Sequence, residues 1–457
     1  MRFADLAEKR VAIWGYGREG RATLAVLRRR LPGQRLALIC SEAEAEAEQA
    51  RAFHQDALDY VTVEPYAGLL WSFDVVIKSP GISAYLPAIV EARAAGVRFT
   101  SATALWFGEN PLARVVGVTG TKGKSTTSAL IAHLLRSLGQ RVALAGNIGL
   151  PLLELIDTPE AVDCWVVELS SFQTGDADRL DVGLINNVYE EHLDWHGSRE
   201  RYVADKLVLA ERASTLVVNA LQHELVARTT AHPRRSVFGS VAGWHVAEGM
   251  IMRGYERVFD LRRLPLAGEH NALNLCAALT VVDALGLDAR AALPSARTFQ
   301  PLPHRLQTLG EQDNLTWVND SISTTPQATI EALRSLEGRA VSVLVGGFDR
   351  GLDWTEFQRH VEWRPPVAVI CLGASGTRIA RQLGAAPTDY RLGHCVALAE
   401  AVALAREWTP PGGVVLLSPG APSFDQFHDY ADRGRAFTQL AGFDPQSIAA
   451  IEGLGIA

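Results

Sequence analysis

Residues Val115 to Thr127 read V-V-G-V-T-G-T-K-G-K-S-T-T, and the rest of the chain is organised around this stretch. A short apolar strand runs into a glycine loop, and the loop runs into Lys124 and Ser125 at the start of a helix. Inward-facing N–H groups of such a loop and the positive end of the helix dipole bind phosphate oxygens. A lysine at this place reaches the outer phosphates, and a serine hydroxyl binds Mg²⁺. The stretch predicts a P-loop that binds a nucleoside triphosphate with magnesium.

The loop departs from the usual spelling G-x-x-x-x-G-K-[ST], because Val118 stands at the first glycine position and the nearest glycine is Gly120. A glycine turn with a chance Lys-Ser pair is the alternative. The strand before the loop and the amphipathic pattern after it favour the P-loop. The expected nucleotide contacts in the loop are Gly120, Thr121, Lys122, Gly123, Lys124, Ser125 and Thr126.

Composition limits the class of protein. The 457 residues predict two or three domains, and 48% hydrophobic with 21% charged residues is typical of a soluble globular protein. A net charge of −7 disfavours nucleic-acid and anionic-membrane partners. Five cysteines without a C-x-x-C pair indicate reduced thiols. Because there is no signal peptide and no stretch that could span a bilayer, we expect a cytoplasmic protein.

The N-terminal region carries the glycine pattern of a dinucleotide-binding turn. The strand Val11–Trp14 meets Gly15-x-Gly17-x-x-Gly20, and we expect a helix from Arg21. An NAD site needs an acidic residue at the end of the second strand, Leu36–Cys40, where Cys40 and Ser41 stand instead. The pattern therefore favours a Rossmann-like diphosphate site over an NAD site. A tight turn without a ligand remains the alternative.

A further strand in this region, from Asp74, ends in a Ser-Pro-Gly turn that contains Ser79. Parallel α/β sheets bind ligands at such strand ends. The polar sequence Glu109-Asn110-Pro111 is typical of a linker, so the first domain should end there.

Three residues of the middle region are candidates for metal chemistry. Glu168 ends an apolar strand, where a magnesium ligand is typical of P-loop folds, although a surface glutamate is the alternative. His192 follows the apolar run Val182–Val188 and is either structural or a contact to metal or phosphate. Lys206 lies in a helical pattern, which by itself indicates a solvated lysine.

A helix is expected to open at Gly268, with Asn271 and Asn274 on one face. These two amides could contact a base or ribose. A helix cap and a surface amide are the alternative.

The C-terminal region predicts another parallel α/β sheet, because four apolar strand candidates alternate with helical stretches. The candidates are Leu315–Val318, Val341–Val345, Val367–Leu372 and Val414–Leu417. Three of them end in polar residues, which suggests a second substrate that closes onto the nucleotide. The expected fold class is α/β with three domains: a Rossmann-like domain at 1–110, a P-loop domain with a parallel sheet at 111–301, and a Rossmann-like domain at 302–457.

Eleven motifs occur in one order along nearly the whole chain: G-Y-G-R-E-G, S-P-G-I-S, G-T-K-G-K-S-T, G-N-I-G-L-P, E-L-S-S-F-Q, E-E-H-L-D, D-K-L, G-E-H-N-A-L-N, L-P-H-R, N-D-S and L-S-P-G-A-P-S-F-D-Q-F. Together they resemble the Mur ligase family, the ATP-dependent amide ligases of peptidoglycan precursor synthesis. Within it they are similar to the members that add glutamate to UDP-N-acetylmuramoyl-L-alanine. The resemblance implies that ATP converts the substrate carboxylate to an acyl phosphate, which the glutamate amine attacks.

The resemblance also implies roles for single residues. The implied catalytic residues are Lys124, Glu168, His192 and Lys206. The implied magnesium ligands are Ser125, Glu168, His192 and Lys206, with Lys206 carbamylated by CO₂. The implied nucleotide contacts outside the P-loop are Asn271, Asn274, Arg305 and Asp320. The implied UDP-substrate contacts are Gly15, Gly17, Gly20, Ser41, Ser79, Asn147 and Ser170. The implied contacts to glutamate are Thr324, Arg350, Ser423 and Tyr430.

Two departures concern the amino acid. Members that add D-glutamate often read N-D-S-K-A-T-N and carry a lysine after a later glycine pair, whereas this chain has Ile322 and Arg350 at those places. Some members add L-glutamate and leave its inversion to an epimerase. The segments W-G-Y-G-R-E-G and D-R-G-L-D-W resemble that branch, so we favour L-glutamate, with D-glutamate as the alternative.

Three other functions can be weighed against the ligase. A folylpolyglutamate synthase would lack the N-terminal Rossmann-like domain. An NAD-linked oxidoreductase would leave the P-loop unexplained. A non-catalytic UDP-sugar-binding regulator would not need Glu168, His192 and Lys206 together. We expect a monomer that binds UDP-N-acetylmuramoyl-L-alanine and glutamate as substrates and has a functional link to a downstream epimerase.

Overall fold

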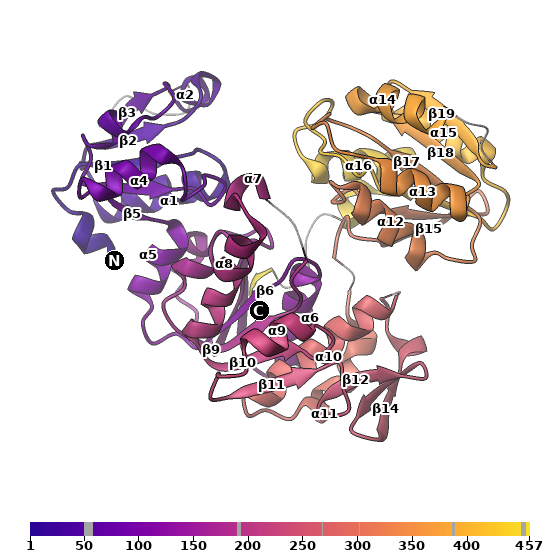
Figure 1. The fold of residues 1–457 in the computed structure, drawn as a ribbon, viewed down its shortest axis with the longest axis horizontal. Helices are drawn as coiled ribbons and strands as arrows, with labels where there is room; N and C mark the ends of the chain where they lie inside the picture. The colour runs from indigo at the N-terminus through magenta and orange to yellow at the C-terminus, as the bar shows by residue number, and fades with distance from the viewer. Residues whose placement is uncertain (50–57, 190–192, 267, 301, 386–388, 449–453) are drawn as a thin grey trace. The chain divides into compact units, whose positions relative to one another are not determined.

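The computed structural model describes residues 1–49, 58–189, 193–266, 268–300, 302–385, 389–448 and 454–457. The chain forms two compact units, Met1–Phe299 with Gly453–Ala457, and Gln300–Glu452 (Figure 1). Within the first unit the chain builds two α/β sheets one after the other, and the second unit contains a third. The division at residues 110 and 301 stays a prediction.

The first sheet is parallel, with the strand order β3-β2-β1-β4-β5. Every residue of β1 and β4 is buried, because helices cover both faces of a parallel sheet. Its strands are β1 Val11–Trp14, β2 Leu36–Ile39, β3 Leu58–Val61, β4 Val75–Lys78 and β5 Arg98–Thr100. Its helices are α1 Arg18–Arg30, α2 Glu42–Gln49, α3 Ala67–Leu70, α4 Pro87–Ala94 and α5 Ala102–Glu109.

Helix α1 begins at Arg18 and not at Arg21. The helix starts inside the glycine motif because its first turn packs directly on the turn after β1. A Cβ atom on Gly20 would lie 2.0 Å from the carbonyl oxygen of Gly15. The close approach therefore requires glycine at position 20.

The second sheet has the strand order β11-β10-β9-β6-β8-β7-β21, and all its strands are parallel except β21. The P-loop strand β6 lies between β9 and β8, so the loop after β6 lies at the centre of the carboxyl edge. The strands are β6 Val115–Thr119, β7 Val142–Gly146, β8 Cys164–Glu168, β9 Leu180–Ile185, β10 Ala213–Asn219, β11 Arg235–Phe238 and β21 Gly455–Ile456.

Two long helices of this part, α6 and α10, pack against each other (Figure 1). Every residue of α10 from Leu275 to Val282 is buried, and all of these except Thr280 are apolar. The helices around the second sheet are α6 Lys124–Ser137, α7 Leu193–His196, α8 Arg199–Arg212, α9 His223–Arg228, α10 Glu269–Ala284 and α11 Ala289–Ala292.

A small antiparallel sheet beside α10 was not predicted from the sequence. Its strands are short, and their outer residues are polar and partly exposed, so they carry no continuous apolar signal. The strands are β12 Trp244–Ala247, β13 Met250–Arg253 and β14 Glu256–Asp260.

The third sheet, in the second unit, has the order β15-β16-β20-β17-β18-β19. The four predicted strands are its central ones, and all of these are parallel. The edge strands were missed because Q-T-L-G-E-Q and R-L-G-H-C alternate or expose polar residues, and β15 runs antiparallel. The strands are β15 Gln307–Gln312, β16 Leu315–Asn319, β17 Val341–Val345, β18 Ala368–Leu372, β19 Arg391–Cys395 and β20 Val414–Leu417. The helices are α12 Pro326–Ser335, α13 Thr355–Trp363, α14 Gly373–Leu383, α15 Leu398–Trp408 and α16 Tyr430–Leu440.

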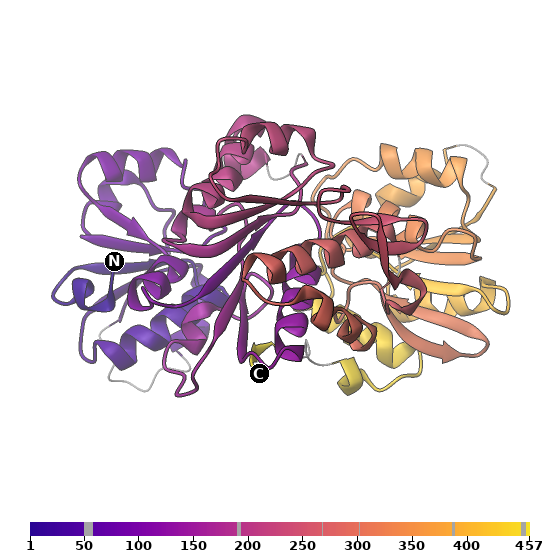
Figure 2. The same ribbon diagram turned by 90° about the horizontal axis from the view of Figure 1, so that it is seen from below.

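The C-terminal strand β21 belongs to the first unit (Figures 1 and 2). It pairs antiparallel with the edge strand β7, and the Val142 N–H donates to the carbonyl oxygen of Ala457 at 2.8 Å. The expected C-terminal domain therefore ends in residues that complete the sheet of the middle region. No sequence pattern predicted this pairing, because it joins positions about three hundred residues apart.

Two expectations from composition can be compared with the structure. All five cysteines lie apart from one another as free thiols, and only Cys40 among them is not buried. Over the described ranges, no helix combines the length and the apolar character needed to cross a bilayer.

Candidate active site

The P-loop forms as predicted, between the end of β6 and the start of α6. Gly123 has φ of +79°, in the left-handed region, and a Cβ atom there would lie 2.5 Å from Oδ1 of Asn274. Helix α6 then begins at Lys124, as a phosphate-binding turn requires. The loop is therefore held so tightly that its second glycine cannot be replaced without strain.

Lys124 folds back over its own loop, and its Nζ donates to the carbonyl oxygens of Gly120 and Thr121, both at 3.0 Å. Thr126 is buried and Lys122 is exposed. The Thr121 hydroxyl lies 2.7 Å from the hydroxyl of Tyr202. It also accepts from the Tyr189 N–H, so Thr121 anchors the loop to the protein.

Glu168 is buried at the carboxyl end of β8, with 1% of its surface exposed, so the surface-glutamate interpretation is wrong. Its Oε1 accepts from Nδ2 of Asn147 at 2.8 Å. Its Oε2 is buried and has no hydrogen-bond partner among the described residues. An unpaired buried carboxylate oxygen is costly unless a cation binds it. The residues present therefore fit a magnesium ion at this place.

Lys206 of α8 is 2% exposed, so the solvated-lysine interpretation is also wrong. Its Nζ donates to the carbonyl oxygen of Gly120 at 3.0 Å and lies 4.8 Å from the centroid of the Tyr202 ring. Lys124 donates to the same carbonyl. The structure thus brings two lysine amines together at the P-loop.

His192 lies outside the described residues, so its expected role stays a prediction. In the part of the chain that the structure describes, no group of three or more His, Cys, Asp or Glu side chains could hold a metal. The expected magnesium site draws on Ser125 and Lys206, which are not among those residue types.

Asn271 and Asn274 are both buried on α10, which contradicts a surface amide. Nδ2 of Asn274 donates to Oδ1 of Asn271 at 3.2 Å, so the two share one face as expected. Oδ1 of Asn274 accepts from Nδ2 of Asn186 at 2.9 Å. Sequence analysis missed Asn186, although its place directly after the buried strand β9 was a usable signal.

The N-terminal glycine turn is closed by Ser79, whose Oγ donates to the carbonyl oxygen of Gly15 at 3.1 Å. Nothing lies within 4 Å of a Cβ atom built on Gly17, so the backbone there is open to a ligand. Ser41 is exposed and bonds Glu44 at the start of α2. Ser170 donates to Oε1 of Gln173 at 2.8 Å.

In the second unit, Asp320 is buried behind β16 with both carboxylate oxygens bonded. It accepts from the hydroxyls of Ser323 and Ser418 and from the Leu306 N–H. Burial raises its pKa to about 6. Arg305, the other nucleotide contact expected in this unit, is half-buried.

Of the residues expected to hold the amino acid, Thr324, Arg350 and Ser423 lie on loops that follow strands of the third sheet, and Tyr430 begins α16. Ser423 is buried, Thr324 and Tyr430 are half-buried, and Arg350 is exposed. The Arg350 loop is fixed by Arg378, which pairs with Asp349 at 2.6 Å and donates to the carbonyl oxygen of Leu352. Arg350 therefore projects from an anchored loop.

Sequence analysis missed Arg433, which is 1% exposed on α16. Its guanidinium donates to Oγ and the backbone oxygen of Ser321, and to the carbonyl oxygens of Ala421 and Pro422, at 2.8 to 3.1 Å. It joins the loop after β16 to the loop after β20. An arginine inside a helix gives no sign of burial, so the sequence held no usable signal.

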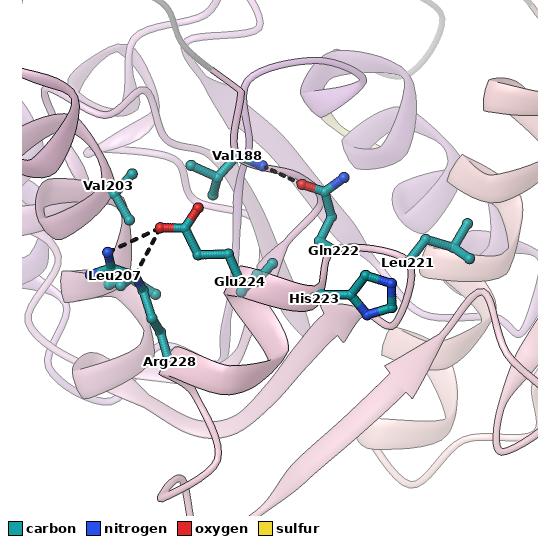
Figure 3. A pocket seen from close by; sticks show the side chains of 9 residues that line it. Val188, Val203, Leu207, Leu221, Gln222, His223, Glu224 and Arg228 are labelled. Carbon is teal, nitrogen blue, oxygen red and sulfur yellow. Dashed lines mark hydrogen bonds and ion pairs between the residues drawn. The ribbon is translucent and has the colours of Figure 1, made fainter.

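A separate cavity of about 180 Å³ lies between α8 and α9 (Figure 3). Val188 and Gln222 meet at its wall, where the Val188 N–H donates to the Gln222 side chain at 3.3 Å. At its rim Glu224 pairs with Arg228 at 3.0 Å. None of the expected site residues that the structure describes lines this cavity.

The sequence was compared with known families and curated proteins. Residues 118–282 match the model described as Mur ligase middle domain, and residues 304–420 match that described as Mur ligase, glutamate ligase domain. The UDP-N-acetylmuramoyl-L-alanine--L-glutamate ligase of Xanthomonas axonopodis pv. citri (strain 306) is 47% identical over 470 residues, with 100% of both chains covered. The protein of the same name from Xylella fastidiosa (strain 9a5c) is 48% identical over 471 residues, also with 100% of both chains covered. That of Salinispora tropica is 40% identical, covering 96% of this chain and 98% of the relative.

Solved structures give the same fold at low identity. The UDP-N-acetylmuramate-alanine ligase of Thermotoga maritima matches with a TM-score of 0.59 and 19% identity, over 94% of this chain and 99% of that chain. The MurF ligase of Thermotoga maritima in complex with ADP matches with a TM-score of 0.58 and 17% identity, over 97% of this chain and 96% of that chain. At these identities the likeness concerns the fold alone.

Proposed function

This chain belongs to the Mur ligase family, and we propose that it joins L-glutamate to UDP-N-acetylmuramoyl-L-alanine with ATP as the phosphoryl donor. One observation carries the proposal. A chain that has two lysine amines at its P-loop, and a Glu168 oxygen without a partner among the described residues, aligns along its whole length with ligases named for L-glutamate. The fold supplies the nucleotide site, and the full-length relatives supply the choice of substrates.

The residues support activation of a carboxylate by phosphorylation. A carboxylate is a poor electrophile and must first be activated. Its oxygen attacks the γ-phosphorus of ATP, the bond between this phosphorus and the bridging oxygen breaks, and ADP leaves as the acyl phosphate forms. Lys124 and the loop N–H groups neutralise the charge that develops on the phosphoryl oxygens. The glutamate amine then attacks the acyl carbon, the tetrahedral intermediate collapses, and phosphate and a proton leave as the amide forms. Exclusion of water protects the acyl phosphate from hydrolysis.

The proposed magnesium ligands are Ser125, Glu168, His192 and Lys206. Bound magnesium supplies charge neutralisation at the phosphoryl group. Oε2 of Glu168 fits this role because it is buried without a protein donor among the described residues. Carbamylation of Lys206 would replace a buried cation by an anion that can ligate a metal. The burial of Lys206 beside the carbonyl of Gly120 is compatible with this change.

The proposed amino-acid site uses Thr324, Arg350, Ser423 and Tyr430. Arg350 offers a planar fork for a carboxylate, whereas a lysine at this place would offer a point charge. Ile322, which is half-buried after β16, stands where members that add D-glutamate often carry a lysine. The proposed site therefore has no lysine charge at that position. Because the product would contain L-glutamate, a separate epimerase must follow if the mature precursor carries D-glutamate.

The decisive experiment measures phosphate release from ATP with UDP-N-acetylmuramoyl-L-alanine and either L-glutamate or D-glutamate. Turnover with L-glutamate alone is the expected result. Turnover with D-glutamate alone would keep the ligase but make Ile322 and Arg350 neutral variants. Absence of turnover with both L-glutamate and D-glutamate would refute the proposal. Fluorescence titration with NADH serves as the control for the oxidoreductase alternative and should show no binding.

A further inference from the structure

A buried histidine that the proposed chemistry does not use lies close to Lys206. His196 ends α7 and has no exposed surface. Its Nδ1 lies 2.6 Å from Oδ2 of Asp205, and its Nε2 lies 3.0 Å from Oγ of Ser171. A carboxylate only accepts hydrogen bonds, so Nδ1 carries the proton of the first bond. The histidine thereby joins α8 to the loop after β8.

Asp205 is the residue directly before Lys206, and each of its acceptors is engaged. Oδ2 meets His196, and Oδ1 accepts from the Tyr85 hydroxyl at 2.7 Å. Its backbone carbonyl accepts from Oγ1 of Thr174 at 2.6 Å. These three bonds come from three different elements, so they fix both the rotation and the axial position of this turn of α8.

The loop after β4, which begins at Ser79, contacts the same place. Oγ of Ser83 donates to the carbonyl oxygen of Trp195 at 2.6 Å, and Nε1 of Trp195 donates to the carbonyl oxygen of Pro80 at 3.1 Å. The Tyr85 ring meets the Trp195 ring edge to face, with 5.7 Å between centroids. The loop expected to contact the UDP substrate is therefore linked to α8 through two successive residues, Trp195 and His196.

Ser171, His196 and Asp205 are connected by hydrogen bonds in the same way as the side chains of a hydrolase triad. That role does not fit, because Ser171 is only 5% exposed and a nucleophile must reach its substrate. Asp205 directly precedes Lys206, whose Nζ donates to the carbonyl oxygen of Gly120 at 3.0 Å, so this chain of bonds bears on the position of that nitrogen. A displacement of about 1 Å at such a site can cost roughly 100-fold in rate.

We propose that His196 and Asp205 are positioning residues that hold Lys206 against the P-loop, and that Tyr85 couples this placement to the loop after β4. The role of Lys206 in turnover rests on the proposed function, but its placement does not. The proposal is therefore tested by a readout that needs no substrate.

The test measures how fast acetic anhydride labels Lys206 in the full-length protein, in CO₂-depleted buffer that keeps the amine free of carbamate, with the site identified by mass spectrometry. In Asp205→Asn and His196→Asn, labelling of Lys206 should rise about 10-fold or more, because local opening exposes the amine. Glu211→Gln is the matched control, since Glu211 is exposed on the same helix and loses the same charge. In Glu211→Gln, the rate at which Lys206 is labelled should stay within about 2-fold of the wild-type rate.

Tyr85→Phe keeps the proposal falsifiable if the buried variants fail to fold, because it removes one hydroxyl from a ring that is 37% exposed. We expect about 3-fold faster labelling of Lys206, whereas Tyr66→Phe, at a ring that is 62% exposed, should change nothing. Unchanged labelling in Tyr85→Phe would overturn the coupling. Unchanged labelling in folded Asp205→Asn and His196→Asn would overturn the positioning role.

Kinetics give a second readout. Asp205→Asn should lower kcat about 10-fold or more while the KM for L-glutamate stays within about 2-fold, because the lost interaction acts in the transition state. An unchanged kcat, or an equal loss in Glu211→Gln, would contradict the proposal. Inactivity of the wild-type enzyme would count against the proposed function alone, since the labelling result stands without turnover.

Discussion

Replacement of Arg433 should loosen the second unit where its two strand-end loops meet. The guanidinium donates four hydrogen bonds to atoms of Ser321, Ala421 and Pro422, and the side chain is 1% exposed. Arg433→Met keeps a side chain of similar length but removes every donor. The four acceptors then lose a partner in a place that water reaches poorly.

The magnitude follows from two opposing terms. At about 1.5 kcal/mol for each charge-assisted bond, the low end of the usual range, the four bonds stabilise the folded unit by about 6 kcal/mol. Burial of the guanidinium lowers its pKa to about 10. That shift corresponds to about 3 kcal/mol that the folded state loses by holding the charge. We therefore expect Arg433→Met to destabilise the unit by about 3 kcal/mol.

The assay is hydrogen–deuterium exchange of the full-length protein, read in peptides that cover β16, β20 and the loops after them. A loss of about 3 kcal/mol should speed exchange of their slowest amides roughly 100-fold. Arg433→Lys keeps the charge but not the planar guanidinium with its several donors. The exchange rate of this variant should therefore lie between those of the wild type and Arg433→Met.

Arg435→Met is the control for Arg433→Met, because Arg435 lies two residues away and its side chain is 45% exposed. Its ion pair with Asp432 should contribute about 0.5 kcal/mol or less. Exchange in Arg433→Met within about 3-fold of the wild type would refute the reasoning.

Lys206→Ala should be nearly inactive in phosphate release and partly rescued by short carboxylates, because the proposed magnesium site needs an anion there; full activity of this variant would exclude a metal-ligand role. Gly123→Ala should raise the KM for ATP at least about 10-fold, since its Cβ would lie 2.5 Å from Oδ1 of Asn274 at a φ of +79°; an unchanged KM would show that the loop can relax. Burial lowers the pKa of His304 to about 4, so between pH 6.5 and pH 4 the unfolded chain binds a proton that the folded state does not. The free energy of unfolding should therefore fall as the pH falls through that window. Between pH 7 and pH 5, His304 should account for a loss of about 2 kcal/mol. In thermal melting, His304→Gln should lose less stability than the wild type between pH 7 and pH 5. An identical pH dependence in both proteins would contradict this role of His304.

Several elements were predictable because their signal is local. The strand β1 and the central strands of the third sheet are continuous apolar runs, and the P-loop needs its glycines at fixed spacing. The edge strands β15 and β19 and the sheet β12–β14 were not predictable in this way. The strands β15 and β19 contain few apolar residues, and β12–β14 are short and partly exposed, so none of them forms a long continuous apolar run.

Three of the missed residues share one physical cause. Asp205, His196 and Arg433 are polar residues in helices, and a helix places polar residues on its solvent face by default. Their burial depends on which loops pack against that face, and those loops come from distant parts of the sequence. The same cause explains why Lys206 looked like a solvated lysine.

The sequence by itself determined the order of the sheets, the P-loop, and the family to which the chain belongs, because each of these depends on residues that are neighbours along the chain. Only the tertiary structure decided that Glu168 keeps a buried oxygen without a partner among the described residues, and that Lys206 meets Lys124 at one carbonyl. It also decided that the last strand closes the sheet of the first unit. Burial and long-range pairing arise from contacts between segments far apart in sequence, and no local pattern encodes them.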